Sequence, residues 1–229
     1  GCKNQPSLHG LSENRSLFAL RARRSSKKVH SMGMQMILRW RYVGVAMALL
    51  FVLSACSPIV IVPDKALESA IRAEIRKPLS VFRTQRDLSQ VRTLNAADLN
   101  VASLEGLQFC VNLNRLNLTN NAVREIGQLG NLTKLVQLHL ANNQIMDIEA
   151  IAGLLSLEYL DLSGDTNVIT DWRHLEANVL NGGLGFESTV KVPYVHTFDS
   201  TGNPRPGFRG AYDAMQDAGV LLDTGQAED

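Results

Sequence analysis

The sequence predicts an α/β solenoid, in which short turns of chain stack on one another and place a parallel sheet along one side. Two observations predict this fold class. Three segments that begin at Leu113, Leu135 and Leu157 superimpose on one another at a fixed step of 22 residues. Each segment has leucine at its first, fourth and sixth positions and a polar residue at its ninth, which is Asn121 in the first segment. Such a step implies turns that bury their apolar side only against their neighbours.

The repeated pattern, LxxLxLxxN, is the signature of a leucine-rich repeat. The central Leu-x-Leu of each copy predicts a short strand, so that successive copies form a parallel sheet. We therefore expect a short leucine-rich-repeat solenoid of about four turns, with the sheet on its concave side and a helical cap at its N-terminal end. The repeats with a C-terminal capping helix are assigned to residues 91–179.

Apolar residues fill the remaining slots of the repeat at the same step. Stepping back 22 residues from Leu113 gives a degenerate first turn, whose slots are Val91, Leu94, Ala96, Val101, Leu104, Leu107 and Cys110. The next two turns continue with Val123, Ile126, Leu129 and Leu132, and with Ile145, Ile148, Ile151 and Leu154. In the fourth turn Val168 fits, but Asp171 breaks the pattern, and we expect a capping helix from Asp171 to about Val179.

Asparagine occupies the bend that follows the strand. Asn121 and Asn143 suit this position because a side-chain amide both donates to and accepts from backbone groups of adjoining turns. In the fourth copy the same step places Asp165 at the bend. An ionised carboxylate retains only the acceptor role there.

Residues 64–90 predict the helical cap. Leu67, Ile71 and Ile75 share one helical face, and Asp64 is placed to cap that helix before Pro78 ends it. Thr84-Gln-Arg-Asp87 resembles a capping box that starts a second, short helix. Both helices would cover the first open edge of the sheet, which otherwise exposes unpaired strand groups.

Residues 64–179 resemble the bacterial internalin-type leucine-rich repeat proteins of the 22-residue class. The resemblance rests on the repeats, the helical cap and the junction from Leu104 to Leu113, which reads LEGLQFCVNL. It implies a non-enzymatic module for protein recognition that needs no cofactor and no metal. A fold-level resemblance of this kind does not identify a ligand.

The side chains beside the inward-pointing leucines predict a binding face. Parallel strands lie about 4.8 Å apart, so residues 22 apart in sequence become near neighbours. The resulting polar and aromatic patch comprises Arg115, Asn117, Gln137, His139, Tyr159 and Asp161. Arginine and tyrosine are enriched at the energetic centres of interfaces, which favours a protein partner on the concave face. The alternative is a solvated sheet face without a ligand.

His139 next to Asp161 also invites comparison with a general base and its orienting carboxylate. No serine or cysteine nucleophile is clearly placed to complete a triad, although Ser163 lies on a nearby column. We interpret the two residues as a polar pair across neighbouring strands, and we expect no catalytic residue.

The residues before the repeats predict a secretory signal peptide. Arg39 and Arg41 precede twelve uncharged residues, 42–53, and a Leu-Ser-Ala-Cys sequence ends at Cys56. Twelve residues in a helix extend only about 18 Å, whereas the hydrocarbon core of a bilayer is about 30 Å thick. We therefore do not expect this segment to be a membrane-spanning helix. Leu-Ser-Ala-Cys resembles the lipobox of bacterial lipoproteins, and this resemblance implies that Cys56 is lipidated. The alternative is an ordinary signal peptide with a chance cysteine. With the lipobox, residues 32–55 form the signal peptide and residues 56–63 the lipidated cysteine and tether. The predicted location is the cell envelope, and in a Gram-negative host the outer membrane facing the periplasm.

Charge separates the leader from the remainder of the chain. Residues 1–31 carry seven Lys or Arg and one acid, whereas residues 57–229 carry fourteen Lys or Arg and twenty-one acids. The acidic balance after Cys56 argues against a nucleic-acid partner. Residues 1–31 are interpreted as upstream translation or a long basic n-region, with a nucleic-acid-binding arm as the alternative.

Residues 180–229 are rich in glycine and proline, and the repeat is not recognisable there. Two alternatives stay open for them, an extended cap or a disordered tail. The sequence indicates a strand or strand pair within 189–198 and a short helix within 211–222. Aromatic residues that could pack on the last turn are Phe186, Tyr194, Phe198, Phe208 and Tyr212. The triplet Asp223-Thr-Gly225 resembles that of aspartic proteases but is interpreted as a turn, and an enzyme with its site in this tail is the remaining rival.

Overall fold

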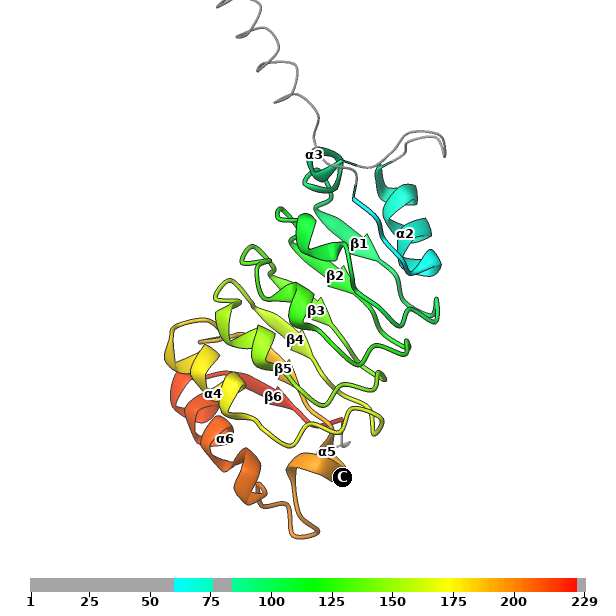
Figure 1. Cartoon of the computed structure of the whole chain (residues 1–229). Coiled ribbons are helices and arrows are strands. Elements are labelled where there is room, and N and C mark those ends of the chain that lie inside the picture. The colour runs from blue at the N-terminus through cyan, green and yellow to red at the C-terminus, as the bar shows by residue number, and fades with distance from the viewer. Residues whose placement is uncertain (1–59, 76–83, 226–229) are drawn as a thin grey trace, which may run out of the picture. The chain divides into compact units, whose positions relative to one another are not determined.

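The computed structural model describes residues 60–75 and 84–225 (Figure 1). All of them belong to one compact unit that spans Ser57–Asp229. The leader, the expected signal peptide, the expected lipidation site at Cys56 and Pro78, which was expected to end the first helix, lie outside the described residues. No helix among the described residues has the length and apolar character needed to cross a membrane.

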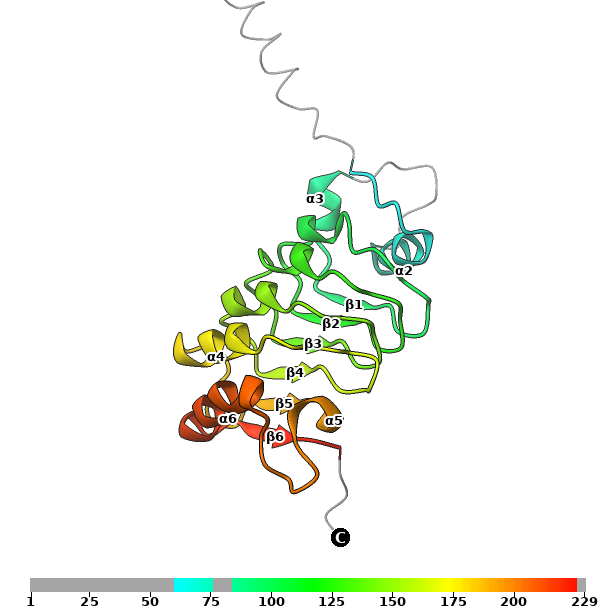
Figure 2. The ribbon, with the colours of Figure 1, turned by 60° about the horizontal axis from the view of Figure 1, so that its bottom comes forward.

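One parallel sheet of six strands runs through the described unit, and its strand order follows the sequence (Figures 1 and 2). Each strand contributes three residues, which is all that a short repeat requires. The strands are β1 (Thr93–Asn95), β2 (Arg115–Asn117), β3 (Gln137–His139), β4 (Tyr159–Asp161), β5 (Thr189–Lys191) and β6 (Leu221–Asp223). The predicted solenoid with a parallel sheet is therefore confirmed, and the sheet extends past the four turns that the repeat step located.

Short helical segments line the side of the solenoid opposite the strands (Figure 2). They lengthen toward the C-terminal end, where two α-helices replace the 3-10 turns. The segments are η2 (Leu107–Phe109), η3 (Gly127–Leu129), η4 (Glu149–Gly153), α4 (Arg173–Leu180) and α6 (Pro206–Ala218). A further short helix, α5 (Tyr194–Thr197), follows β5.

The core lies between the sheet and these helical segments. Every apolar slot that the 22-residue step assigned to the first three turns is buried. The central residues of β2, β3 and β4 illustrate this burial, since Leu116, Leu138 and Leu160 are all fully buried. Burying one such leucine contributes about 1.5–3 kcal/mol, so stacking of turns supplies the main stabilisation.

The asparagine positions form the predicted ladder between turns. Asn143 is fully buried, and its Oδ1 accepts from the N–H of Val123 at 3.0 Å, while its Nδ2 donates to the carbonyl oxygens of Leu118 and Leu140 at 2.9 and 3.0 Å. Asn121 makes equivalent bonds one turn earlier, including one from the N–H of Val101 at 2.8 Å.

The fourth turn departs from the expected spacing. Asn167, not Asp165, takes the ladder position: its Oδ1 accepts from the N–H of Ile145, and its Nδ2 donates to the carbonyl of Leu140. The turn thus contains two extra residues at the bend, where Gly164 adopts a φ of 95° that favours glycine.

This insertion moves the core residues of the fourth turn by two positions. Ile169 and Trp172 are each 2% exposed and Leu175 is fully buried, whereas Val168 is 38% exposed. The expectation that Val168 fills a core slot is therefore wrong. The expected break in the 22-residue step is observed, because the next strand pairs 30 residues further along the chain. The helix expected from Asp171 is observed as α4, which packs between η4 and α6.

Residues 180–225 form two more turns of the same sheet. Val190 of β5 pairs with Leu160 of β4 and with Leu222 of β6, and it is fully buried. Four of the five expected aromatic residues pack against the core: Phe208 contacts Trp172 at a ring-centroid distance of 5.0 Å, and Tyr194, Phe198 and Tyr212 complete the cluster. Phe186 is the exception, because it is 80% exposed.

The N-terminal cap is built as the sequence predicted. In helix α2 (Lys65–Ile75), Oδ1 of Asp64 accepts from the N–H groups of Ala66 and Leu67. The other carboxylate oxygen accepts from two N–H groups of the first turn, those of Ala102 and Ser103. Burial alone would raise the pKa of Asp64, but these four backbone bonds hold it below its usual value.

A capping box starts the second helix, α3 (Gln85–Leu88). The Thr84 hydroxyl accepts from the N–H of Asp87, and the Asp87 carboxylate accepts from the N–H of Thr84. Helix α2 contacts both α3 and β1, so this cap covers the first strand of the sheet.

Candidate functional site

The solvent-facing side chains of β1–β6 form one surface, which we call the sheet face. The parallel register places Arg115 beside Gln137 and Gln137 beside Tyr159. The second column consists of Asn117, His139 and Asp161 in neighbouring strands. All six residues predicted for partner binding are thus brought together on three adjacent strands.

Two aromatic rings meet at the centre of the sheet face. The centroids of His139 and Tyr159 lie 4.6 Å apart, with an angle of 34° between their planes. Partial burial, more than the opposing effect of the Asp161 carboxylate, holds the pKa of His139 below its ordinary value. Burial and the same carboxylate raise the pKa of Tyr159. Both rings are therefore neutral at neutral pH and present an aromatic surface with polar edges.

The hydrogen bonds of Asp161 do not favour a catalytic pair with His139. Its Oδ1 accepts from both the hydroxyl and the N–H of Ser163, at 2.6 and 3.0 Å. In the described part of the chain no hydrogen bond joins His139 to Asp161. A base and its orienting group need such a bond, so the geometry favours the interpretation of these two residues as a polar pair across strands.

Arg115 and Asn117 lie at the other side of the patch. Arg115 is exposed and forms no ion pair with any described residue, so its guanidinium is available to an external acceptor. Asn117 is half-buried, and its Oδ1 accepts from the N–H of Thr119 at 3.0 Å. Gln137 is half-buried between Arg115 and Tyr159.

Two charged residues extend the second column beyond what the repeat step could find. Lys191 of β5 lies beside Asp161, and Asp223 of β6 lies beside Lys191. Nζ of Lys191 is 2.7 Å from Oδ2 of Asp223, and this contact raises the pKa of the lysine and lowers that of the aspartate. The sequence of residues 189–192, Thr-Val-Lys-Val, alternates between polar and apolar residues, and this alternation could have placed Lys191 on the solvent-facing side of β5. Asp223 therefore serves as an ion-pair partner at the end of β6.

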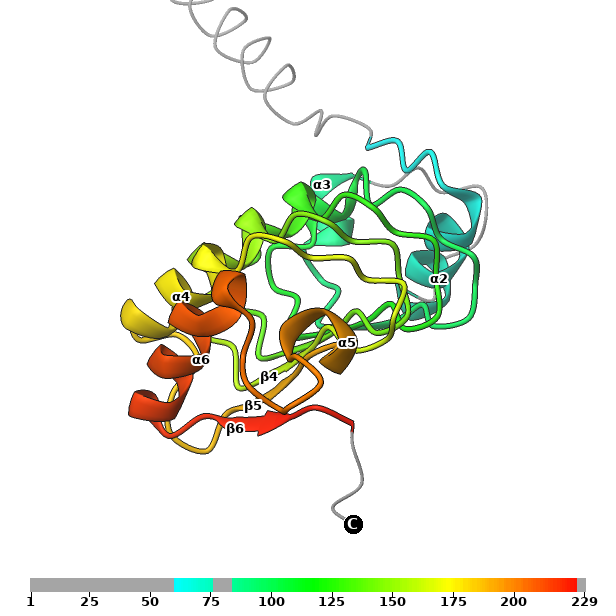
Figure 3. The same ribbon diagram turned by 90° about the horizontal axis from the view of Figure 1, so that it is seen from below.

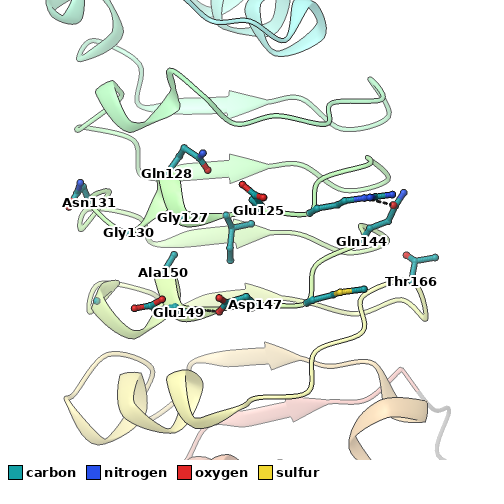
Figure 4. A pocket seen from close by; sticks show the side chains of 14 residues that line it. Glu125, Gly127, Gln128, Gly130, Asn131, Gln144, Asp147, Glu149, Ala150 and Thr166 are labelled. Carbon is teal, nitrogen blue, oxygen red and sulfur yellow. Dashed lines mark hydrogen bonds between the residues drawn. The ribbon is translucent and has the colours of Figure 1, made fainter.

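A hollow of about 1080 Å³ lies away from the sheet face, against the helical side of the second and third turns (Figure 4). Its lining includes Glu125, Asp147 and Glu149, and also Gln128, whose Oε1 is buried without a hydrogen-bond partner among the described residues. No group of three or more His, Cys, Asp or Glu side chains in the described ranges is arranged to hold a metal ion.

Comparisons with known proteins agree with this architecture. A family model described as leucine rich repeats (2 copies) matches residues 133–177. The chain has the leucine-rich repeat fold. An internalin, inlF, from Listeria monocytogenes has 28% sequence identity and a TM-score of 0.52, over 60% of this chain and 46% of that one. Internalin C2, inlC2, from the same species has 27% identity and a TM-score of 0.52, over 73% of this chain and 67% of that one.

The chain spans about half the length of the first of these structures. No curated protein matches it. The repeats together with the internalin-like neighbours support an internalin-like leucine-rich repeat protein and, as its class of function, a module for protein–protein interaction.

Proposed function

We propose that the protein is a lipid-anchored lipoprotein of the bacterial envelope that recognises a protein partner through its sheet face, without catalysing a reaction. The observation that carries the proposal is the cluster of Arg115, His139, Tyr159 and Asp161 on adjacent strands. Arginine and tyrosine are the residue types that most often dominate binding energy at protein interfaces.

The backbone beneath this cluster favours recognition because it holds the side chains in place before a partner arrives. β3 pairs with a strand on each side, and the central leucine of each of these strands is buried. A surface whose residues are already ordered loses little conformational entropy on binding. The stacked His139 and Tyr159 rings offer a rigid aromatic contact, while Arg115 provides a cation for an acidic group of the partner.

The anchor is proposed from the sequence before the repeats. Lipidation of Cys56, followed by the tether that ends at residue 63, would hold the sheet face near the membrane. Stable anchoring requires more than one acyl chain, and tethering raises the effective concentration of a module near partners on the same membrane. Ser57 rather than aspartate after the cysteine favours the outer membrane in a Gram-negative host.

The sheet face is tested by a triple variant, Arg115→Ala, Tyr159→Ala and Asp161→Ala, in capture of partners from envelope extracts. A matched control variant carries Arg124→Ala, Met146→Ala and Glu149→Ala, which are exposed positions around the hollow on the opposite side. We expect the first variant to lose a specific partner that the control retains. A protein whose repeats serve only as structural spacers would tolerate both variants equally.

The anchor is tested by the intact mass of the N-terminal peptide from the membrane fraction. The proposal predicts a peptide that begins at Cys56 and carries the mass of a diacylglycerol group. An unmodified Cys56, or a chain that retains residues 1–31 in the cytosol, would contradict it.

A further inference from the structure

The two ends of the sheet differ in how they are covered. At the first end, α2 contacts β1, and the buried side chains of Val60 and Val62 belong to the segment that precedes it. At the other end, β6 pairs with β5 on one side only. In the view from below, no labelled element lies across β6 (Figure 3).

Four backbone groups on the outer side of β6 make no hydrogen bond with any described residue. The N–H of Leu221 donates to Ser188, and the carbonyl of Asp223 accepts from Val192, so residues 221 and 223 direct their backbone groups toward β5. By strand alternation the N–H and C=O of Leu222 point outward, together with the carbonyl of Val220 and the N–H of Thr224. Two donors and two acceptors therefore stand ready for a further parallel strand.

Apolar side chains accompany these unpaired groups. Leu221 is 59% exposed at the start of β6, and Phe186 is 80% exposed with its ring against Gly219. Edge strands are often protected by charged side chains, especially lysine, or by proline. β6 contains no lysine or proline, and its one charged side chain, Asp223, is paired with Lys191 of β5. The combination of an open edge with exposed leucine and phenylalanine indicates a surface that a strand with apolar residues would cover.

The charges along the second column define the partner more closely. Asp161, Lys191 and Asp223 alternate in sign from β4 to β6. Directly opposite charges stabilise neighbouring strands, and like charges destabilise them. The next position in the column therefore favours a basic residue.

We propose that the outer edge of β6 binds an extended segment of a partner protein, which adds a seventh parallel strand. The segment carries an apolar residue opposite Leu222 and a lysine or arginine opposite Asp223. This edge is a second interaction surface, separate from the cluster around Tyr159.

The protein contains its own precedent for this pairing. β4 ends in Leu160-Asp161 and is followed in the sheet by Val190-Lys191 of β5, with leucine opposite valine and aspartate opposite lysine. β6 ends in the same pair, Leu222-Asp223, and no described strand follows it. The segment that fits the edge of β6 is therefore one that resembles β5.

The test uses a fluorescent peptide that copies residues 187–193, ESTVKVP, and measures its binding to the full chain by fluorescence anisotropy. A control peptide exchanges the valine and lysine of the central Val-Lys pair, which directs the lysine into the core and removes it from Asp223. Leu222→Pro removes one outward N–H and blocks the edge, while it leaves the N–H groups that face β5 intact. Thr224→Pro likewise removes one outward N–H, at the residue that follows β6. Thr224→Pro is used in place of Leu222→Pro if Leu222→Pro lowers the melting temperature.

We expect the β5-like peptide to bind the full chain and to lose about tenfold or more in affinity toward the proline variant. The control peptide with valine and lysine exchanged should bind the unsubstituted chain no more tightly than the β5-like peptide binds the proline variant. The triple sheet-face variant should bind the peptide normally, so that failure of the sheet-face proposal and failure of this one are distinguishable.

Equal binding of the two peptides, or equal binding to the chain with and without the proline, would overturn the proposal. A dimer of the full chain that Leu222→Pro converts to a monomer would make a second copy the occupant of the edge, and it would overturn the proposal as well.

Discussion

Replacing Asn143 by alanine tests whether the asparagine ladder holds successive turns together. The side chain is fully buried and makes four hydrogen bonds to the backbone, accepting one from Val123 and donating three to the carbonyls of Leu118, Leu140 and Ala141. Adding the strengths of the four bonds would overstate the loss of stability, because each of the three carbonyl oxygens also accepts a hydrogen bond from another asparagine.

Each of the three carbonyls keeps a second donor after the substitution. Leu118 still accepts from Nδ2 of Asn121, Leu140 from Nδ2 of Asn167 and Ala141 from the N–H of Asn120. Only the N–H of Val123 is left buried without a partner. An unsatisfied buried N–H costs about 1–3 kcal/mol, and with the net loss of the weakened bonds we expect Asn143→Ala to lower the free energy of unfolding by about 2–4 kcal/mol.

The assay is urea unfolding of the full chain followed by circular dichroism. Asn117→Ala is the matched control, because that asparagine is half-buried and water can replace its bond to Thr119; it should cost less than about 1 kcal/mol. Equal losses for the two variants would refute a stabilising ladder. If Asn143→Ala lowered the free energy of unfolding by well over about 4 kcal/mol, the second donors would not compensate the three carbonyls as expected.

Three further predictions concern the shifted turn, the buried thiol and the central histidine. Ile169→Ala should lower the free energy of unfolding by about 2–4 kcal/mol and Val168→Ala by less than about 1 kcal/mol; the reverse order in urea unfolding would contradict the two-residue insertion. Burial raises the pKa of Cys110 to about 12, so peptide mapping should find this thiol unalkylated in the native chain at pH 8 and fully alkylated in urea. Because the folded pKa of His139 lies below its ordinary value of 6.5, the unfolded state takes up a proton first as the pH falls. The free energy of unfolding should therefore decrease as the pH falls below about 6.5, and it should decrease less in His139→Gln. Urea unfolding of both proteins at pH 7.5 and 5.5 measures this difference, and the same pH dependence in both would contradict the lowered pKa of His139.

The sequence predicted the regular part of the fold well, because leucine placement and the Asn bend are local requirements of each turn. Every core position of the first three turns and both columns of the binding patch follow from one constant step. The N-terminal cap was equally predictable, since Asp64 caps α2 and Thr84 caps α3 through contacts close in sequence. The bonds from Ala102 and Ser103 to Asp64 were not predicted, because these residues lie far from Asp64 in the sequence.

The C-terminal turns were missed because the step between strands changes there. Tyr159 pairs with Thr189, a step of 30 residues, and Thr189 pairs with Leu221, a step of 32. A search at 22 residues cannot find either strand. The insertion at the fourth bend hid Asn167 in the same way, since the step pointed to Asp165. Lys191 and Asp223 were consequently absent from the predicted site.

The exposed position of Phe186 has a different origin. A large aromatic residue near the last turn is ordinarily expected to join the core. Trp172, Phe198 and Phe208 contact one another edge to face in the core, whereas the ring of Phe186 lies against Gly219 at the surface. Which of several aromatic residues enters a core depends on the three-dimensional packing, which the sequence pattern does not specify.

Site-specific photo-crosslinking in the native host tests recognition of a partner through the sheet face. A benzoyl-phenylalanine in place of Tyr159 keeps an aromatic ring at the centre of the sheet face, and the same residue in place of Met146, which is 67% exposed, serves as the control on the opposite side. Recognition through the sheet face should give a discrete cross-linked protein from position 159, and this product should disappear when Arg115 and Asp161 are replaced by alanine. No product at position 159, or the same product from position 146, would contradict recognition through the sheet face.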